Sequence, residues 1–345
     1  MRMANVILLI TVCFARPALA NPCTGADDAY SRISLELAHR GVEAAERILN
    51  QIPQSSAECP SALLAKARVT AAKGDSNSAE SLLRNYLEIA PDDPRGYAYL
   101  ARLLIDESKF PEADAASATA IGKDPGNAAA LAVRGQLIAM KGDKNGGVEL
   151  LTKAENLDPE DAEVQFQLGS IYDRAKLPAK AVLHFKKALS LDPGDPRAWD
   201  YLALNLEPLG DLKGAAESYQ RGLQVNHGGR NFDSFLDYND GRFLMKQGDL
   251  EQSRIHLDRA VQLVPEMRAT WYERARLELR QKDYQAARKD AETAAGIGDP
   301  DDVIIDLQIY TILEQIYRRL GETDLANKYA DLERTTPPPV RGEHH

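Results

Sequence analysis

The prolines of this chain recur with a fixed period. Pro91, Pro125, Pro159 and Pro193 follow one another at intervals of 34 residues. The first stands in the tetrapeptide APDD and the others in DPGN, DPED and DPGD, so the flanking residues recur as well. A period of this length is typical of stacked supersecondary units, each of which buries its apolar face against its neighbours. We therefore expect an elongated array rather than one closed globule, and an array favours binding over catalysis.

Small residues recur inside the period where two helices would approach closely. If each proline is position 32 of a unit, small side chains fill positions 8, 20 and 27 with few exceptions, and position 4 is mostly bulky. Position 8 holds Ala67, Ala101, Gly135, Gly169 and Ala203, and position 20 holds Ala79, Ala113, Gly147, Ala181 and Ala215. Small and large side chains that face each other let helices interdigitate. The pattern predicts two packed helices in each unit.

The turn between the two predicted helices has its own signal. Gly-Asp pairs stand at positions 15 and 16 of three units, beginning at Gly74, Gly142 and Gly210. Glycine adopts the left-handed conformation that ends a helix, and the aspartate then caps the next helix. Two other units place Pro111 and Pro178 in the first turn of the second helix, where a missing N–H costs little.

Together these residues resemble the tetratricopeptide repeat family, whose 34-residue pattern is W/L-x-x-L-G/A-x-x-Y…A…F…A…P. The fourth unit follows it most fully, with Leu168-Gly169-Ser170-Ile171-Tyr172 and then Ala181, Phe185, Ala188 and Pro193. The resemblance implies an all-α fold, a right-handed superhelical α-solenoid of stacked antiparallel helix pairs. It is specific for the fold and says little about the ligand, because the family is a scaffold for many partners.

The resemblance also divides the chain. Residues 60–227 are expected to form five regular units, and residues 228–335 three less regular units that include an insertion of four residues. Residues 21–59 are predicted to form a degenerate helical hairpin that caps the array, which gives about eight units plus this hairpin. The Pro-rich residues 336–345 are predicted to be a disordered tail.

The amino terminus has the features of an export signal. Arg2 precedes the apolar stretch from Val6 to Phe14, and the sequence Ala18-Leu19-Ala20 matches a small-x-small cleavage site. We predict a signal peptide over residues 1–20, removed after Ala20, and hence a periplasmic or extracellular protein. An uncleaved anchor remains the alternative. No second apolar segment follows, so no membrane insertion of the remaining chain is predicted.

Two cysteines, Cys23 and Cys59, flank the predicted N-terminal hairpin. A hairpin starts and finishes at the same end, so the two thiols could meet, and an oxidising compartment would permit a disulfide. Such a bridge would stabilise the terminal unit, which packs against only one neighbour. Two free thiols remain the alternative.

The composition argues against several classes of function. The chain has 52 acidic and 42 basic residues and a net charge of −10, which disfavours nucleic acid and anionic membrane surfaces as partners. No histidine pair has a metal-ligand spacing, and no strand precedes a glycine-rich phosphate loop. We therefore predict no catalytic residue, metal site or cofactor, and no enzymatic activity.

The residues of the predicted binding surface follow from the resemblance. In tetratricopeptide arrays, positions 2, 5, 9 and 12 of the first helix line the concave groove. In the last three units these positions include aromatic residues and arginines, which often carry binding energy. The predicted peptide-binding residues are Phe235, Tyr238, Arg242, Tyr272, Arg276 and Arg318.

Two Tyr-x-x-x-Arg pairs in consecutive units suggest the chemistry of the ligand. Arginine binds carboxylates with two parallel hydrogen bonds, so we expect acidic or C-terminal peptide segments as ligands. The lysine–asparagine set that some family members use to clamp C-terminal carboxylates is not found. In the alternative interpretation Tyr272 packs on a neighbouring helix and the arginines pair with Glu273 or Asp237.

Two classes of function stay open. The first is a non-enzymatic adaptor of the cell envelope that holds a peptide or helix of another protein in its groove. The second is a structural or self-assembling subunit of an envelope or secretion complex, whose contacts come from another face.

Overall fold

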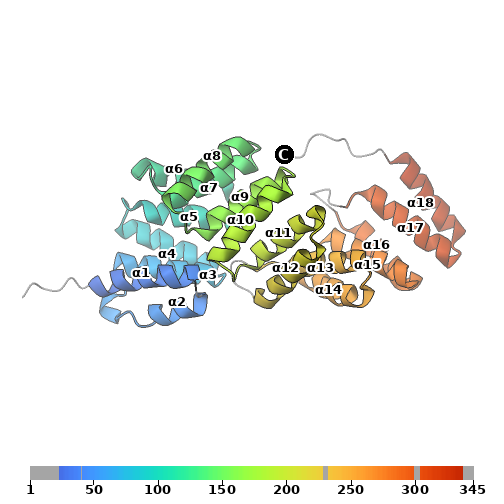
Figure 1. Ribbon diagram of the computed structural model, residues 1–345, viewed down its shortest axis with the longest axis horizontal. Helices are drawn as coiled ribbons and strands as arrows, with labels where there is room; N and C mark the ends of the chain where they lie inside the picture. The colour runs from blue at the N-terminus through green and yellow to red at the C-terminus, as the bar shows by residue number, and fades with distance from the viewer. Residues whose placement is uncertain (1–22, 40, 228–231, 299–303, 337–345) are drawn as a thin grey trace, which may run out of the picture.

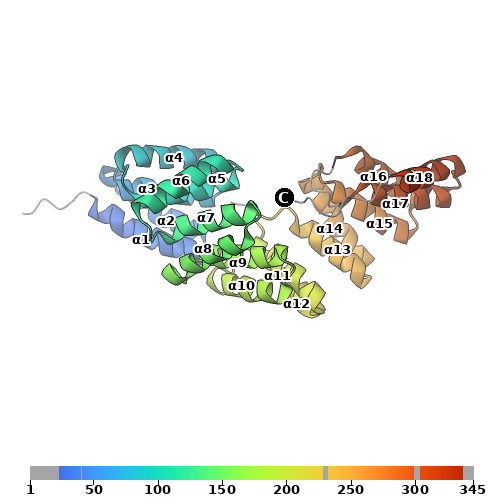
Figure 2. The same cartoon turned by 90° about the horizontal axis from the view of Figure 1, so that it is seen from above.

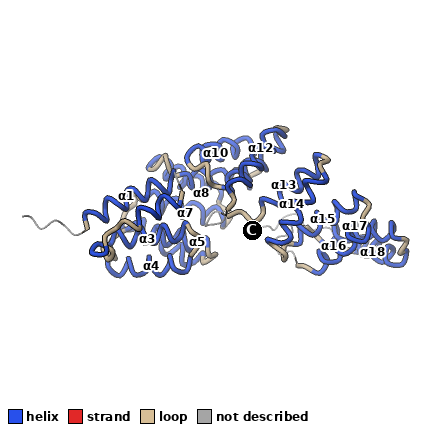
Figure 3. The backbone as a smooth tube through the Cα atoms, turned by 90° about the horizontal axis from the view of Figure 1, so that it is seen from below, coloured by secondary structure: helices blue, strands red, loops and turns tan. Residues whose placement is uncertain are grey.

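The structure is a computed structural model that describes residues 23–39, 41–227, 232–298 and 304–336. The predicted signal peptide, residues 228–231 at the insertion and residues 337–345 of the predicted tail lie outside this part. The described chain is helical throughout and contains no strand (Figure 3). Its α-helices are α1 Thr24–His39, α2 Val42–Leu49, α3 Pro60–Ala72, α4 Ser76–Ile89, α5 Pro94–Asp106, α6 Phe110–Lys123, α7 Ala128–Met140, α8 Lys144–Leu157, α9 Ala162–Arg174, α10 Pro178–Leu191, α11 Pro196–Leu206, α12 Leu212–Val225, α13 Leu236–Gln247, α14 Leu250–Leu263, α15 Arg268–Gln281, α16 Tyr284–Gly296, α17 Asp306–Leu320 and α18 Thr323–Thr335.

Successive helices pack as antiparallel pairs, from α1 with α2 to α17 with α18, and the pairs stack side by side (Figure 1). This confirms the predicted all-helical fold of stacked pairs. Short connections force each pair to be antiparallel, and each pair then buries the rest of its apolar surface against the next pair. The result is a curved array in which α13–α18 extend beyond α1–α12 (Figure 2).

The Gly-Asp turns hold the pairs in register. Gly74, Gly142 and Gly210 have φ of 87°, 102° and 80°, in the left-handed region. The carboxylates of Asp75 and Asp143 then accept backbone hydrogen bonds from Ser78 and Gly146 in the first turn of the following helix. Each aspartate thereby satisfies one of the N–H groups that a helix start leaves without an intrahelical partner.

Small residues bring the helices of a pair together. In the fourth unit Phe185 of α10 is fully buried and its ring lies against Gly169 of α9. A Cβ atom at residue 169 would approach the ring to 2.7 Å, closer than van der Waals contact permits. Phe166 and Tyr201 pack around the same ring, with centroids 5.7 Å and 5.5 Å from it. The core is thus a series of such clusters along the array.

Two contacts hold the N-terminal hairpin against the rest of the array. A disulfide joins Cys23, just before α1, to Cys59, just before α3, with a Cα–Cα distance of 5.6 Å. A hydrogen bond of 3.3 Å also joins the hydroxyl groups of Tyr30 of α1 and Tyr99 of α5. The hairpin is therefore held against both α3 and α5.

A polar contact links the regular part of the array to its last three pairs. Asn239 of α13 donates a hydrogen bond of 2.7 Å to the carboxyl of Asp200 on α11, and both side chains are buried. Burial raises the pKa of Asp200, because the charged carboxylate is removed from water.

Candidate functional site

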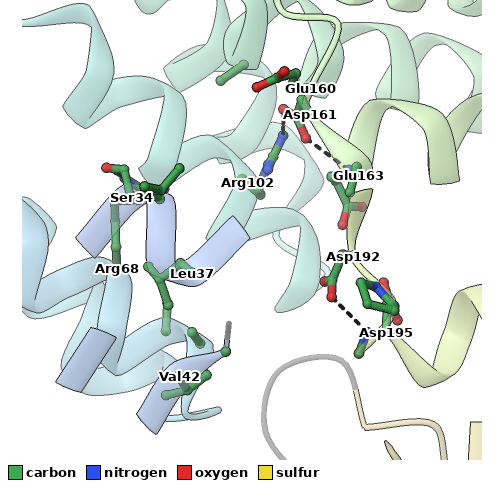
Figure 4. A pocket seen from close by; sticks show the side chains of 18 of the residues that line it. Ser34, Leu37, Val42, Arg68, Arg102, Glu160, Asp161, Glu163, Asp192 and Asp195 are labelled. Carbon is green, nitrogen blue, oxygen red and sulfur yellow. Dashed lines mark hydrogen bonds and ion pairs between the residues drawn. The ribbon is translucent and has the colours of Figure 1, made fainter. Parts of the chain in front are cut away.

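The structure contains a cavity of about 1310 Å³ that is lined by residues of the α1–α12 part of the array. Its walls come from α1, α3 and α5, from the turns that precede α9 and α11, and from the end of α12. These segments are far apart in the sequence, and Figure 4 shows their side chains facing one cavity. Its apolar lining includes Leu35, Leu37, Val42, Ala71, Leu103 and Trp199.

One wall of the cavity carries a stacked arginine. The guanidinium of Arg68 lies 4.7 Å from the ring centre of Tyr99 and 5.5 Å from that of Tyr30, so it forms two cation–π contacts. Arg68 also donates a hydrogen bond to Ser34 of α1. These contacts fix the arginine at the surface of the wall.

The opposite wall is acidic. It is made by the DPED and DPGD turns of the 34-residue period, at 158–161 and 192–195, and by the first residues of the helices that follow. Its carboxylates are Asp158, Glu160, Asp161, Glu163, Asp192 and Asp195. The motif that ends each unit also caps the next helix. Asp161 accepts a hydrogen bond from the backbone N–H of Glu163, and Asp195 accepts one from that of Arg197.

Part of this acidic wall is neutralised within the protein. Arg102 lies 3.4 Å from Asp161, and Arg197 lies 2.9 Å from Glu163 and 2.7 Å from Asp195. Arg221 is a further cation of the lining. When Arg68, Arg102, Arg197 and Arg221 are all counted, six carboxylates still face four guanidiniums.

Three carboxylates of the wall, those of Asp158, Glu160 and Asp192, make no ion pair within the described ranges. Asp158 and Glu160 are exposed, whereas Asp192 is half-buried. Burial raises the pKa of Asp192, and the neighbouring carboxylate of Asp195 adds to the shift, although the backbone N–H of Gly194 and the guanidinium of Arg197 oppose it. The cavity therefore presents an excess of negative charge beside an apolar surface.

The predicted peptide-binding residues lie elsewhere, at the start of α13 and on α13, α15 and α17, and none of them lines the cavity. Phe235 is 47% exposed, whereas Tyr238 is buried in the core, only 7% exposed. Arg318 is exposed and paired with Glu314 of the same helix.

The other predicted residues make contacts within the protein. Arg276 is paired with Glu273 at 2.7 Å and lies 5.7 Å from the ring centre of Tyr272. Arg242 lies 3.7 Å from Glu207. The pairing of Arg276 with Glu273 is the alternative interpretation weighed from the sequence. A peptide site at these residues stays a prediction.

A buried carboxyl on α15, that of Glu278, is expected to make the stability of the C-terminal pairs depend on pH. Burial and the neighbouring carboxylate of Asp290 raise the pKa of Glu278 to about 7, although Arg274 and Arg254 oppose the shift. The folded-state pKa lies above the ordinary value of 4.5. This group therefore stabilises the fold fully below about pH 4.5, and its contribution is lost as the pH rises through about 7.

We expect the free energy of unfolding of α13–α18 to fall between pH 6 and pH 8, because Glu278 then ionises in a buried place. Glu278→Gln should make this fall smaller and should stabilise the protein at pH 8. Urea unfolding at the two pH values measures both effects, with the exposed Glu266→Gln as control. An unchanged pH dependence in Glu278→Gln would contradict the assignment.

Among the described residues, no group of three or more His, Cys, Asp or Glu side chains is arranged to hold a metal ion. Among the described helices, none combines the length and the apolar character that crossing a membrane requires.

The sequence matches known proteins over most of the array. Tetratricopeptide repeat profiles match residues 70–137, 141–196 and 238–302, together more than half of the chain. The human Protein O-mannosyl-transferase TMTC3 is 27% identical over 192 residues, which are 55% of this chain and 21% of that protein. The chain thus spans about a fifth of the length of this relative.

Solved structures share the fold. The crystal structure of the APC/C hetero-tetramer Cut9-Hcn1 gives a TM-score of 0.67 at 17% identity, covering 85% of this chain and 55% of that chain. The structure described as human IFIT1 dimer with PPP-AAAA gives a TM-score of 0.54 at 20% identity, covering 85% of this chain and 68% of that chain. At such identities the likeness extends to the fold alone.

Proposed function

Because the chain belongs to the tetratricopeptide repeat family, we propose that it is a non-enzymatic protein-interaction scaffold that holds a segment of a partner protein in the cavity of α1–α12. The observation that carries this proposal is the cavity itself. Its volume of about 1310 Å³ exceeds the roughly 300–1,000 Å³ of ordinary small-molecule pockets, so it suits a stretch of polypeptide.

The walls of the cavity support the same function, because contacts within the protein hold their charged side chains in place. Arg68 is held by two aromatic rings, and Arg102 is paired with Asp161 across the cavity. A partner segment would therefore bind without ordering these side chains, which lowers the entropic cost of association.

Partner capture tests this proposal. Ala72 lines the cavity, so Ala72→Trp should fill part of it and lower the yield of captured partner at least tenfold. Ala115 is exposed on α6 and does not line the cavity, so Ala115→Trp is the matched control and should keep the yield. Cross-linking in native extract with mass spectrometry measures both. Equal yields from the two variants would show that the partner does not bind in the cavity.

The location of the protein is part of the proposal. The predicted export signal over residues 1–20 and the disulfide between Cys23 and Cys59 both favour an oxidising compartment, such as a periplasm or the extracellular space. Amino-terminal sequencing of the native protein tests this. Asn21 as the first residue would support export, and a chain that begins at Met1 would contradict cleavage.

A second candidate site is the predicted surface of α13, α15 and α17 for acidic or C-terminal segments. The exposed ring of Phe235 and the exposed guanidinium of Arg276 favour it. Tyr272→Ala with Arg276→Ala should abolish capture if this surface binds the partner. A structural role in self-assembly predicts that neither this variant nor Ala72→Trp changes the size of the assembly.

A further inference from the structure

We propose that the partner segment held in the cavity is cationic and amphipathic, with lysine or arginine side chains against the acidic wall and apolar side chains against Leu35 and its neighbours. This inference rests on the proposed function, since it names the chemistry of the segment that the same cavity would hold. Three observations support it: the excess of carboxylates around the cavity, the contacts that already engage Arg68 and Arg102, and the apolar lining.

The charge balance favours a cation. Six carboxylates and four guanidiniums surround the cavity, and Asp158, Glu160 and Asp192 form no ion pair among the described residues. Inside a cavity with low-dielectric walls, the potential of such an excess is focused on the ligand. A lysine or arginine of the partner would complete the ion pairs that these three carboxylates lack.

Two of the three arginines that line the cavity, Arg68 and Arg102, are already engaged within the protein. Arg68 is stacked on Tyr30 and Tyr99, and Arg102 is paired with Asp161. An acidic segment would have to compete with Asp161 for Arg102 and would approach the unpaired carboxylates at the same time. Like charges brought together in a binding site oppose association, so the cavity selects against acidic segments.

The apolar lining indicates that the partner segment carries apolar side chains as well as positive charge. Leu35 of α1 is 60% exposed and lines the cavity together with Leu37, Val42 and Trp199. Exposed apolar side chains gathered in one concavity are typical of a binding surface. A segment with apolar residues on one side and basic residues on the other would contact both the apolar lining and the acidic wall.

A pair of synthetic peptides tests the inference by fluorescence anisotropy at 0.15 M NaCl and pH 7. The probe is the labelled, amidated 14-residue peptide KLLKLLKKLLKLLK, and its comparison has glutamate in place of every lysine. We expect the lysine peptide to bind at least ten times more tightly. A third peptide, with serine in place of every leucine, should also bind at least ten times more weakly than the probe.

Variants that neutralise carboxylates show whether the acidic wall is what attracts the lysine peptide. Asp158→Asn, Glu160→Gln and Asp192→Asn together keep the shape of the wall and should weaken binding of the lysine peptide about tenfold, or roughly 1.4 kcal/mol. The control carries Glu149→Gln, Glu266→Gln and Asp331→Asn, which remove three exposed charges outside the cavity. It should change the affinity less than twofold.

The outcomes separate this inference from the proposed function. If the acidic-wall variant and the control bind the lysine peptide equally, or if the glutamate peptide binds as well, the cationic inference is overturned. If Ala72→Trp abolishes partner capture while the acidic-wall variant retains it, the cavity is the site and only the chemistry is wrong. If the lysine peptide binds Ala72→Trp as it binds the wild type, the cavity is not the site.

Discussion

Phe185→Ala is expected to lower the free energy of unfolding of the central units by about 3–5 kcal/mol. Phe185 is fully buried between α9 and α10, with Phe166, Tyr201 and Gly169 around its ring. Alanine would remove this apolar surface and leave a cavity that the rigid helices cannot close completely. Urea unfolding, followed by far-UV circular dichroism, measures the change.

Leu183→Ala is the control for this prediction. Leu183 lies on the same helix and is 66% exposed, so its removal should change stability by less than about 0.5 kcal/mol. A loss below about 1 kcal/mol in Phe185→Ala would show that the packing of the ring against Gly169 does not hold the pair together.

Removal of the disulfide should have the second large effect. Cys23→Ser with Cys59→Ser opens a bridge between residues separated by 36 positions, and the chain-entropy account gives about 3–4 kcal/mol for a loop of this length. Because each pair contacts mainly its neighbours, the loss should be confined to the terminal hairpin. Hydrogen exchange should accelerate in α1 and α2 and remain unchanged in α9 and α10.

The same variant connects stability to binding. Ser34, Leu35 and Leu37 of α1 line the cavity, so a loosened hairpin should also weaken binding of the lysine peptide. Reduction of the wild-type protein provides the control, since it breaks the same bridge without a substitution. Unchanged exchange in α1 after both treatments would contradict the role given to the bridge.

The repeat pattern predicted the fold because each of its signals acts over a short range. The proline period, the Gly-Asp turns and the small residues at positions 8 and 20 each describe contacts within a pair or between neighbouring pairs. Gly169 against Phe185 is an example: both residues belong to one 34-residue unit, and their packing follows from the pattern.

The location of the cavity did not follow from these signals. Its walls join residues near 35 to residues near 195, and that juxtaposition depends on the small rotation that each pair adds to the last. Such rotations accumulate over several units and are not encoded by a single motif. In the sequence the DPED and DPGD turns mark the 34-residue period, and their repeated carboxylates are the visible sign of an acidic wall.

The predicted groove residues show a second reason why a binding site could not be predicted from the sequence alone. Arg276 follows Glu273 by three positions on one helix, a spacing at which side chains meet, so an internal ion pair competes with any ligand. Tyr238 occupies a position expected to face the groove, yet it is buried against the core shared by α13–α18.

Photocross-linking from single positions shows where on the array a partner binds. A photoreactive amino acid would replace Leu35 in the cavity, Phe235 at the start of α13 or Leu183 on α10, three exposed positions of which only Leu35 lines the cavity. We expect a partner to be captured from position 35 and not from position 183 or 235. Capture from position 235 with none from position 35 would contradict it and would assign binding to the C-terminal surface.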